Sequence, residues 1–441
     1  MKVLLISYIF APQNAIAAIR TTKIAKYLLK SGYEVDVLCG PSKTYDPILL
    51  KDKKLIKHIE VINNFAFPFN FYKKQISLIN NLPKNEKLRS SSKYKITKKL
   101  VGILPNPISV YLDLLNSFLW YYKARQGSYL LNNRYDIILS SFGPLSSHLL
   151  GLYAKKKNKK SLWIADYRDP MINELQRGII QAIYRYFQDK FLSESDLSFC
   201  VSDGLNASLS RINSNAKIYT IRNGFDPEDI QLGSIQNNLF KFEREKVIFS
   251  YCGALYNGRR DLSPLFLALS NLISKKKVNR RDIEVHYAGA GFYLISNMAK
   301  RYGLEDRIID HGLVPRDKAL QLVNSSDIGL VASWNTKNDQ GVITGKVYEL
   351  FLLRKMILCF ISGDIGNSEL RNMIESANAG YVYEEAIDSI LELENQLLAV
   401  YRIKMREGKI IQDYDDEYVK KFSYDIIAKQ IDSVIADSMI V

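Results

Sequence analysis

The chain is poor in cysteine and in histidine. Its 441 residues contain four of each, and the cysteines, at positions 39, 200, 252 and 359, lie far apart. Their spacing matches no metal-binding motif. Each cysteine lies in or at the end of an apolar, strand-like run, so we expect buried, reduced thiols in a cytoplasmic protein.

Apolar runs long enough to cross a membrane are also absent, since none approaches the roughly 18 residues that a spanning helix needs. Hydrophobic residues make up 47% of the chain and charged residues 24%, as in ordinary globular proteins, and the length favours two or three domains. Residues 1–17 resemble a short signal peptide. They also complete a strand–loop–helix–strand unit whose first strand cleavage would remove, so we favour the strand.

Acidic residues are scarce in one segment. The net charge is +15, and residues 51–100 hold thirteen Lys or Arg against three Asp or Glu, so +10 of the charge comes from this stretch. Five of its aromatic residues are grouped at positions 65, 67, 69, 71 and 72. A basic segment with aromatic side chains suits an anionic membrane surface, at about 1 kcal/mol per basic residue near the surface. The alternatives are a solvated insertion and a nucleic acid, which the same charge would attract; no nucleic-acid motif is present, and we expect no such partner.

Apolar runs alternate with helical patterns along most of the chain. This alternation predicts parallel sheets covered by helices on both faces. The irregular basic insertion covers about 64–104, and the polar region 222–245 suits a linker between domains. Strands are expected near 2–8, 33–39, 59–63, 137–140, 162–165, 197–201 and 218–221, and then near 247–251, 283–288, 307–311, 328–331 and 356–360.

The strand at 218–221 runs into Asn223-Gly-Phe-Asp226, and a complete second α/β unit follows. This order resembles the domain junction of the retaining glycosyltransferases of family 4, which use nucleotide sugars. The resemblance implies an α/β fold with two facing Rossmann-like domains, the GT-B fold, and an active site in the cleft between them. It divides the chain into an N-terminal acceptor-side domain (1–222), a C-terminal nucleotide-sugar-binding domain (223–414) and a last helix (415–441) that returns to the first domain.

Ligands of such sheets bind beyond the carboxyl ends of the strands, which directs attention to the loop after the first strand. Family members often carry paired glycines there, whereas the stretch from Phe10 to Arg20 has none. The resemblance makes Arg20 a cleft residue that binds an anion. The alternative is a surface arginine on the first helix.

A second loop reads Asp166-Tyr-Arg168-Asp169-Pro, and it is similar to a loop of a bacterial polysaccharide-synthesising subgroup. Asp166 and Asp169 then orient acceptor hydroxyls or supply a catalytic base, and Arg168 faces the cleft. The alternative is an Arg–Asp brace within the loop. The resemblance would place His148, on the helix after Ser140-Ser-Phe-Gly-Pro, against the sugar. The alternative is a core histidine whose hydrogen bonds are made within the protein.

Two loops of the second half resemble donor-binding segments. Gly253-Ala-Leu-Tyr-Asn-Gly258-Arg259-Arg260 is similar to a glycine-rich turn whose basic residues face the diphosphate. Guanidinium groups bind phosphate oxygens as a fork, and the N-terminus of the next helix favours anions, although surface charges flanking a helix are the alternative. The loop 311–315 would place Val314 against the nucleotide base.

The stretch Thr344-Gly345-Lys346-Val-Tyr-Glu349 resembles the last donor-binding segment of the family. Its members commonly carry two glutamates eight positions apart, and Glu349 matches the second, which binds the ribose. The first falls on Gly341, with Asp339 as a candidate to replace it near the sugar. Lys346 and the amides of residues 344–346 open a helix, where a phosphate would bind.

The resemblance implies a hexosyltransferase that moves a sugar from a nucleoside diphosphate donor, UDP favoured over GDP, to a hydroxyl of a lipid-linked or polysaccharide acceptor. The expected setting is bacterial surface polysaccharide synthesis (capsule, O-antigen or exopolysaccharide), on the inner face of the cell membrane, with retention and with neither metal nor cofactor. No Asp-x-Asp motif lies where a metal-dependent transferase needs it. The alternatives are a catalytically degenerate subunit that binds a nucleotide, glycan or partner, and a nucleotide-sugar epimerase on the same fold.

Overall fold

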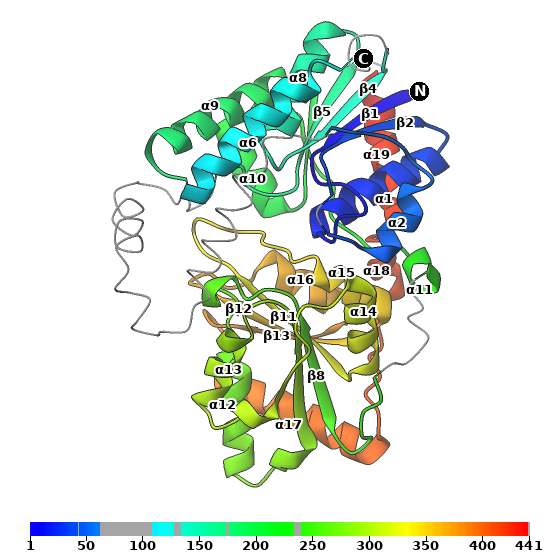
Figure 1. Cartoon of the computed structure of the whole chain (residues 1–441). Helices are drawn as coiled ribbons and strands as arrows, with labels where there is room; N and C mark the ends of the chain where they lie inside the picture. Colours follow the sequence, from blue (N-terminus) through cyan, green and yellow to red (C-terminus); the bar gives the residue numbers. More distant parts are fainter. Residues whose placement is uncertain (43, 62–107, 128–133, 173–175, 233–239, 440–441) are drawn as a thin grey trace, which may run out of the picture.

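The computed structural model describes the chain apart from residues 43, 62–107, 128–133, 173–175, 233–239 and 440–441. The basic insertion expected over about 64–104 therefore lies outside the described residues. Two α/β domains face each other, one above the other in Figure 1. Among the described helices, none combines the length and the apolarity that a bilayer span requires.

The N-terminal domain is built on a parallel sheet of seven strands in the order β3-β2-β1-β4-β5-β6-β7. Because the strand order reverses between β1 and β4, the loops after these two strands diverge and leave a crevice. Helices α6, α8 and α9 pack on one face, and α1 and α19 on the other. The elements are β1 (Lys2–Ser7), α1 (Ile16–Lys30), β2 (Glu34–Cys39), α2 (Pro47–Lys53), β3 (Lys57–Glu60), α6 (Ile108–Ala124), β4 (Ile137–Ser141), α8 (Ser146–Lys157), β5 (Leu162–Tyr167), α9 (Gly178–Glu194), β6 (Leu197–Cys200), α10 (Asp203–Ile212) and β7 (Ile218–Thr220).

The C-terminal domain has a parallel sheet of six strands in the order β10-β9-β8-β11-β12-β13, with the reversal between β8 and β11. Both sheets thus present their ligand-binding crevices in the way the sequence predicts. The elements are α11 (Glu228–Leu232), β8 (Val247–Cys252), α12 (Ser263–Ser274), β9 (Ile283–Ala288), α13 (Phe292–Lys300), β10 (Ile308–Asp310), α14 (Arg316–Ser325), β11 (Ile328–Trp334), α15 (Lys346–Leu353), β12 (Met356–Ser362), α16 (Glu369–Ser376), β13 (Gly380–Glu384) and α17 (Ile390–Glu407). Two helices follow this domain along the chain, α18 (Asp416–Lys420) and α19 (Tyr424–Met439).

The last helix, α19, returns to the N-terminal domain, as expected. Ile427 and Ile431 are buried in the same apolar cluster as Val3 of the central strand β1. The chain therefore crosses between the domains twice, and the two crossings are hydrogen-bonded to each other. The amide of Phe225 donates to the carbonyl of Phe422, and the amide of Tyr424 donates to the carbonyl of Phe225, both at 2.9 Å.

The four cysteines are free thiols, as the sequence predicts. Cys39, Cys200 and Cys359 are buried, and Cys252 is half-buried at the end of β8. Burial raises the pKa of Cys39 to about 12 and that of Cys200 to about 11. These thiols are therefore protonated at neutral pH, and their role is packing.

Candidate functional site

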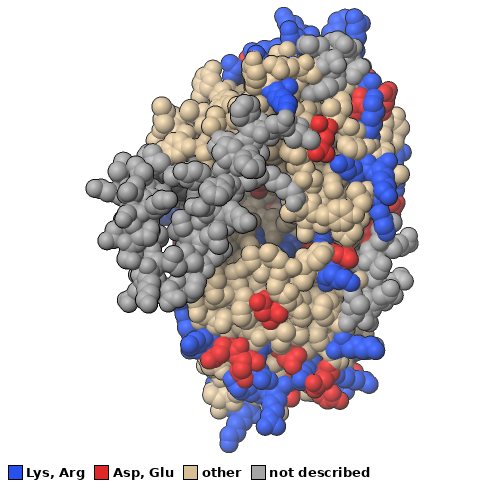
Figure 2. All heavy atoms as spheres, viewed as in Figure 1, with Lys and Arg blue, Asp and Glu red and all other residues tan. Residues whose placement is uncertain are grey.

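A cleft separates the two domains, and Figure 2 shows the hollow between them. The domains touch closely along its sides. Gly345, just before α15, approaches Ile16 at the start of α1 so closely that an added Cβ would lie 2.8 Å from the Cδ1 of Ile16. Loops of both sheets therefore meet at one place, where a ligand can contact both domains.

Lys346 carries the most informative positive charge of the cleft. Its ammonium lies 3.4 Å from the hydroxyl of Tyr251 and 4.6 Å from the centre of the Tyr251 ring. In the described part of the chain, no carboxylate lies within ion-pairing distance of it. Burial, reinforced by the nearby charge of Arg260, lowers the pKa of Lys346 to about 7. An anion placed here would remove the cost of burying this charge.

Arg260 is a second cation without a carboxylate partner among the described residues. It is 8% exposed, donates to the carbonyl of Ala254 at 3.2 Å, and lies over the ring of Tyr256 at 4.4 Å. Its Nε has no hydrogen-bond partner. The half-buried Lys346 and the buried Arg260, which have no carboxylate partner in the described ranges, form a site suited to a ligand with more than one negative charge.

Arg259, the neighbouring arginine, is placed differently. It pairs with Asp339 at 2.9 Å and stacks over Trp334, 4.2 Å from the ring centre. Asp339, a candidate to lie near the sugar, thus binds Arg259 in this structure. The sequence analysis treats the two arginines alike. In the structure, Arg259 has a carboxylate partner, whereas Arg260 has none among the described residues.

The backbone around these cations is shaped by glycine and by the start of α15. Gly253 has φ +130°, and an added Cβ would lie 2.7 Å from the Cε of Lys346. Thr344 is buried, and its hydroxyl has no hydrogen-bond partner. The amides of Val347 and Tyr348 in the first turn of α15 already donate to the carbonyls of Thr344 and Gly345 at 3.2 Å, so it is the positive end of the α15 dipole that favours an anion here.

Gly253→Ala is expected to weaken binding of UDP about tenfold or more, because the new methyl group displaces Lys346 while the backbone is strained at positive φ. Gly258→Ala is the matched control, since Gly258 also has positive φ (+89°) but an added Cβ there would meet nothing within 4 Å. Isothermal titration of both variants measures the difference. Equal losses in both would show that backbone strain, and not displacement of Lys346, weakens binding.

Glu349 faces the same cleft but is held by an arginine that sequence reasoning missed. Its Oε1 accepts a hydrogen bond of 2.7 Å from the Nε of Arg316, the first residue of α14. Val314, half-buried, lies two residues earlier in the loop predicted to meet the base. The sequence contains a clue to this pairing. A positive charge in the first turn of a helix is unfavourable next to the helix dipole, so Arg316 is expected to have a carboxylate partner.

Three residues predicted for the N-terminal side of the cleft, Arg20, Asp166 and His148, are buried in this structure. Arg20 is 1% exposed, so it is neither a surface arginine nor open to a ligand anion. Its guanidinium grips the carboxylate of Asp166 through Nε at 3.1 Å and through a terminal nitrogen at 2.6 Å. Asp166 is equally buried and also accepts from the Ser141 hydroxyl at 2.9 Å, so it cannot contact an acceptor.

His148 is likewise enclosed. It is 0% exposed, its Nδ1 lies 2.9 Å from the Ser140 hydroxyl, and the rings of Tyr167 and Phe191 lie edge-on to it at 4.9 and 5.3 Å. Burial lowers its pKa to about 3, so the ring is neutral. The structure places His148 in the core, where it cannot lie against a sugar.

Arg168 and Asp169 lie closer to the cleft. Arg168 donates to the carbonyls of Phe142 and Gly143 and thereby fixes the loop that follows β4. It also pairs with Asp169 at 3.4 Å, and the Asp169 side chain is exposed. Asp169 is thus the exposed carboxylate of this loop, and its assignment to the acceptor remains a prediction.

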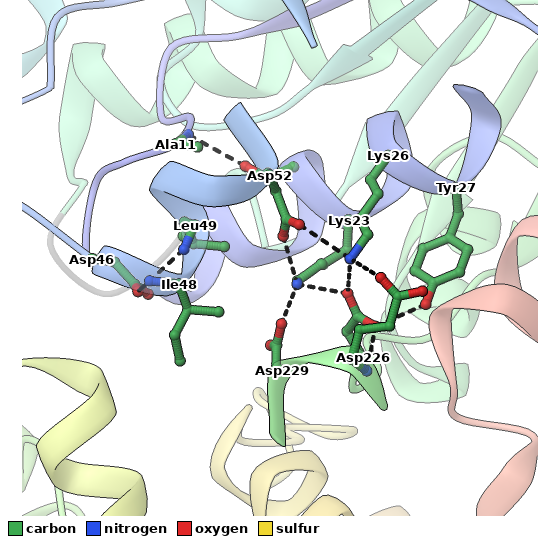
Figure 3. A network of polar contacts seen from close by, with 12 residues as sticks. Ala11, Lys23, Lys26, Tyr27, Asp46, Ile48, Leu49, Asp52, Asp226 and Asp229 are labelled. Carbon is green, nitrogen blue, oxygen red and sulfur yellow. Dashed lines mark hydrogen bonds and ion pairs between the residues drawn. The ribbon is translucent and has the colours of Figure 1, made fainter. Parts of the chain in front are cut away.

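A buried ionic cluster, here called the junction network, joins the domains (Figure 3). The ammonium of Lys23 lies 2.6 Å from Asp52 and 2.7 Å from Asp226, and it also contacts Asp229. Lys26 binds Asp226 at 2.6 Å. The three carboxylates converge closely enough to suggest a cation site, but the ammonium groups of Lys23 and Lys26 already lie among them and offset two of the three negative charges. Sequence reasoning missed this network, although Lys23 and Lys26 lie three residues apart and therefore on one side of α1.

A second contact between the domains involves Gly341, the position at which the sequence comparison expected a glutamate. Gly341, with φ +69°, lies so close to the start of α10 that an added Cβ would be 2.7 Å from the Ser202 hydroxyl and 2.9 Å from the Cα of Gly204. Glu369 of α16 accepts from the amide of Gly204 at 3.1 Å. A glutamate at position 341 would therefore clash with the N-terminal domain in this arrangement.

Two facing α/β domains with a shared cleft define the GT-B fold, and solved structures with this fold cover the whole length of the chain. Sucrose-phosphate synthase from Thermosynechococcus elongatus aligns with TM-score 0.62 at 15% identity over 99% of this chain and 98% of its own. HepE from Anabaena, in complex with UDP and glucose, aligns with TM-score 0.60 at 14% identity over 99% and 100%. The lipopolysaccharide outer core galactosyltransferase WaaB aligns with TM-score 0.57 at 15% identity over 99% and 99%. No protein-family model and no curated protein matches the sequence.

Proposed function

We propose that the protein is a glycosyltransferase that uses a UDP-sugar donor. The observation that carries this proposal is a pair of cations without carboxylate partners among the described residues, the half-buried Lys346 and the buried Arg260, beside Gly253 in the interdomain cleft. A nucleoside diphosphate supplies the negative charges that these cations lack. HepE, which has the same fold, has been solved with UDP, with UDP and glucose, and with UDP-glucose, which favours uridine over guanosine as the base.

In this proposal, Lys346 and Arg260 bind the diphosphate of the donor. As the bond between the sugar and the diphosphate breaks, negative charge grows on the leaving oxygen, and the two cations and the positive end of the α15 dipole stabilise it. Glu349 accepts hydrogen bonds from the ribose hydroxyls. Asp169 faces the acceptor hydroxyl, and the closed domains keep water from hydrolysing the donor.

The acceptor we propose is a lipid-linked or polysaccharide hydroxyl in the synthesis of a bacterial surface polysaccharide, with retention of configuration and without a metal. Among the proteins of this fold, WaaB is described as a lipopolysaccharide outer core galactosyltransferase. Association with the inner face of the membrane is supported by exposed apolar side chains on α6 and α9 and by the basic sequence of residues 51–100, which precedes α6. The exposed residues are Leu115, Phe118, Tyr122, Ile179 and Tyr186.

The full chain is tested with UDP-glucose, UDP-galactose, UDP-N-acetylglucosamine and GDP-mannose, with and without a mixture of lipid-linked saccharides. Transfer with release of UDP supports the proposal, and the configuration of the new bond, read by nuclear magnetic resonance, tests retention. Thermal stabilisation reports binding separately, at about 2.7 kcal/mol when the ligand is 100 times its dissociation constant.

Two other results would each replace the proposal. Binding of a nucleotide without turnover of any donor would identify a degenerate subunit, a reading that the missing glycines and Gly341 favour. Conversion of one UDP-sugar into another without an acceptor would identify an epimerase. Absence of binding to every nucleotide would remove the donor site itself.

A further inference from the structure

Arg316 is a buried arginine that faces carboxylates from three different parts of the chain. It is 8% exposed, and its Nε donates to Glu349 of α15 at 2.7 Å. One terminal nitrogen lies 3.3 Å from Asp229 of α11, and the other lies 3.7 Å from Asp46. Burial disfavours the charged form, but the three carboxylates together hold the pKa of Arg316 above its ordinary value.

Two of these three carboxylates belong to the junction between the domains. Asp46 caps the N-terminus of α2 in the N-terminal domain, where its Oδ1 accepts from the amides of Ile48 and Leu49. Its Oδ2 faces Arg316 and has no hydrogen-bond partner. Asp229 also contacts Lys23 of α1. Arg316 therefore connects Glu349 of the C-terminal domain to α1 and α2 of the N-terminal domain.

The buried carboxylates of this junction outnumber its buried cations. Burial raises the pKa of Asp46 and of Asp229, and in both cases Arg316 opposes the effect. A change in the hydrogen bonding of Glu349 alters how the guanidinium is shared among its partners, because a single arginine serves all three. The buried members are the carboxylates Asp46, Asp52, Asp226 and Asp229 and the cations Lys23, Lys26 and Arg316.

We propose that Arg316 is a positioning residue that couples occupancy of the donor site to the contact between the two domains. The inference rests on the proposed function, because it needs a nucleotide whose ribose hydroxyls donate to Glu349. When they do, Glu349 gives up part of its interaction with Arg316, and the guanidinium strengthens its contacts with Asp46 and Asp229. Binding in one domain thereby tightens the junction with the other, and by linkage a tighter junction raises the affinity for the nucleotide.

Hydrogen exchange of the full chain with and without saturating UDP tests the coupling. In the wild type we expect UDP to slow exchange in the donor segments 253–260 and 344–349, and also in α2 and α11, which a nucleotide in the cleft does not need to touch. Arg316→Lys keeps the charge but loses the fork. In this variant we expect donor-segment protection at saturation, no protection of α2 and α11, and a dissociation constant for UDP about tenfold higher.

Two further variants separate coupling from folding. Arg280→Lys makes the same exchange at an arginine that forks Asp306 outside the cleft, and it should behave as the wild type does. Asp46→Asn keeps the helix cap but removes the charge that faces Arg316. It should weaken UDP binding in the same direction, and its effect should not add to that of Arg316→Lys, because both remove one connection.

The inference fails if UDP protects the donor segments of the wild type but leaves α2 and α11 unchanged, or if Arg316→Lys retains the protection of α2 and α11. It also fails if Asp46→Asn and Arg316→Lys have independent, additive effects on the dissociation constant. A wild type in which no nucleotide protects the donor segments gives a different result, because it overturns the proposed function and the coupling with it.

Discussion

Lys346→Met is expected to lower kcat/KM for transfer from the UDP-sugar by about 100-fold to 1,000-fold, the usual cost of removing one donor to a developing charge in a closed site. The physical reason is that Lys346, which has no carboxylate partner in the described part of the chain, supplies charge for the leaving diphosphate. Met has a similar length and apolar stem, so packing against Tyr251 is preserved. Steady-state kinetics measure the loss, and Lys300→Met, at an exposed lysine of α13, is the control.

Lys346 is also expected to make the affinity for the donor depend on pH. In the free protein, the pKa of Lys346 is lowered from 10.5 to about 7, whereas a bound diphosphate favours the charged form and raises the pKa again. The affinity for UDP-glucose is therefore full below pH 7 and falls by about tenfold per pH unit above it, until the pKa of the complex is reached. Lys346→Arg should bind with an affinity that does not change between pH 7 and 9. A wild type with a flat profile over this range would contradict the assignment of Lys346 to the diphosphate.

The second large effect is on stability. Arg20→Met is expected to lower the free energy of unfolding by about 3–5 kcal/mol, because it leaves the buried carboxylate of Asp166 without its partner. For domains of this size, such a loss corresponds to a fall in Tm of roughly 10 °C. Differential scanning fluorimetry measures the shift.

Two controls make that result specific. Arg280→Met breaks an ion pair with Asp306 whose two side chains are both more than 40% exposed, and it should cost less than about 1 kcal/mol. Arg20→Met combined with Asp166→Ala removes both buried charges and should recover part of the lost stability. A double variant that is less stable than Arg20→Met alone would show that the pair is not the source of the effect.

The fold could be predicted from the sequence because its signals are local. Most strands of the two sheets are apolar runs followed by a helical pattern, which can be recognised from neighbouring residues alone. The edge strand β3, with the sequence Lys57-His-Ile-Glu60, is an exception. The returning helix was also local, since Ile427 and Ile431 lie four residues apart on one face. These elements needed no knowledge of which distant residues they meet.

The site was harder to predict because it depends on partners that are far apart along the chain. Arg20 and Asp166 are separated by 146 residues, and each alone looks like an exposed polar residue next to a cleft. Pairing made both of them buried and removed them from the predicted site. The same reasoning applies to Arg316 and Glu349, whose pairing no local motif reveals.

Gly341 shows the opposite case, in which a broken motif has a structural cause. The sequence presents a missing glutamate, which favours lost activity when taken alone. In the structure, the position lies against Ser202 and Gly204 of the other domain, so glycine fits the close approach. The departure from the motif therefore carries less weight against catalysis than the sequence suggests.

The return of α19 to the first sheet affects how the protein is made. The core of the N-terminal domain joins Val3 to Ile435, so it needs residues from both ends of the described chain. The C-terminal domain, by contrast, completes its core once Val419 and Phe422, which follow α17, have left the ribosome. The domain that is translated first is thus completed after the second one, because its sheet is covered only when α19 has been synthesised.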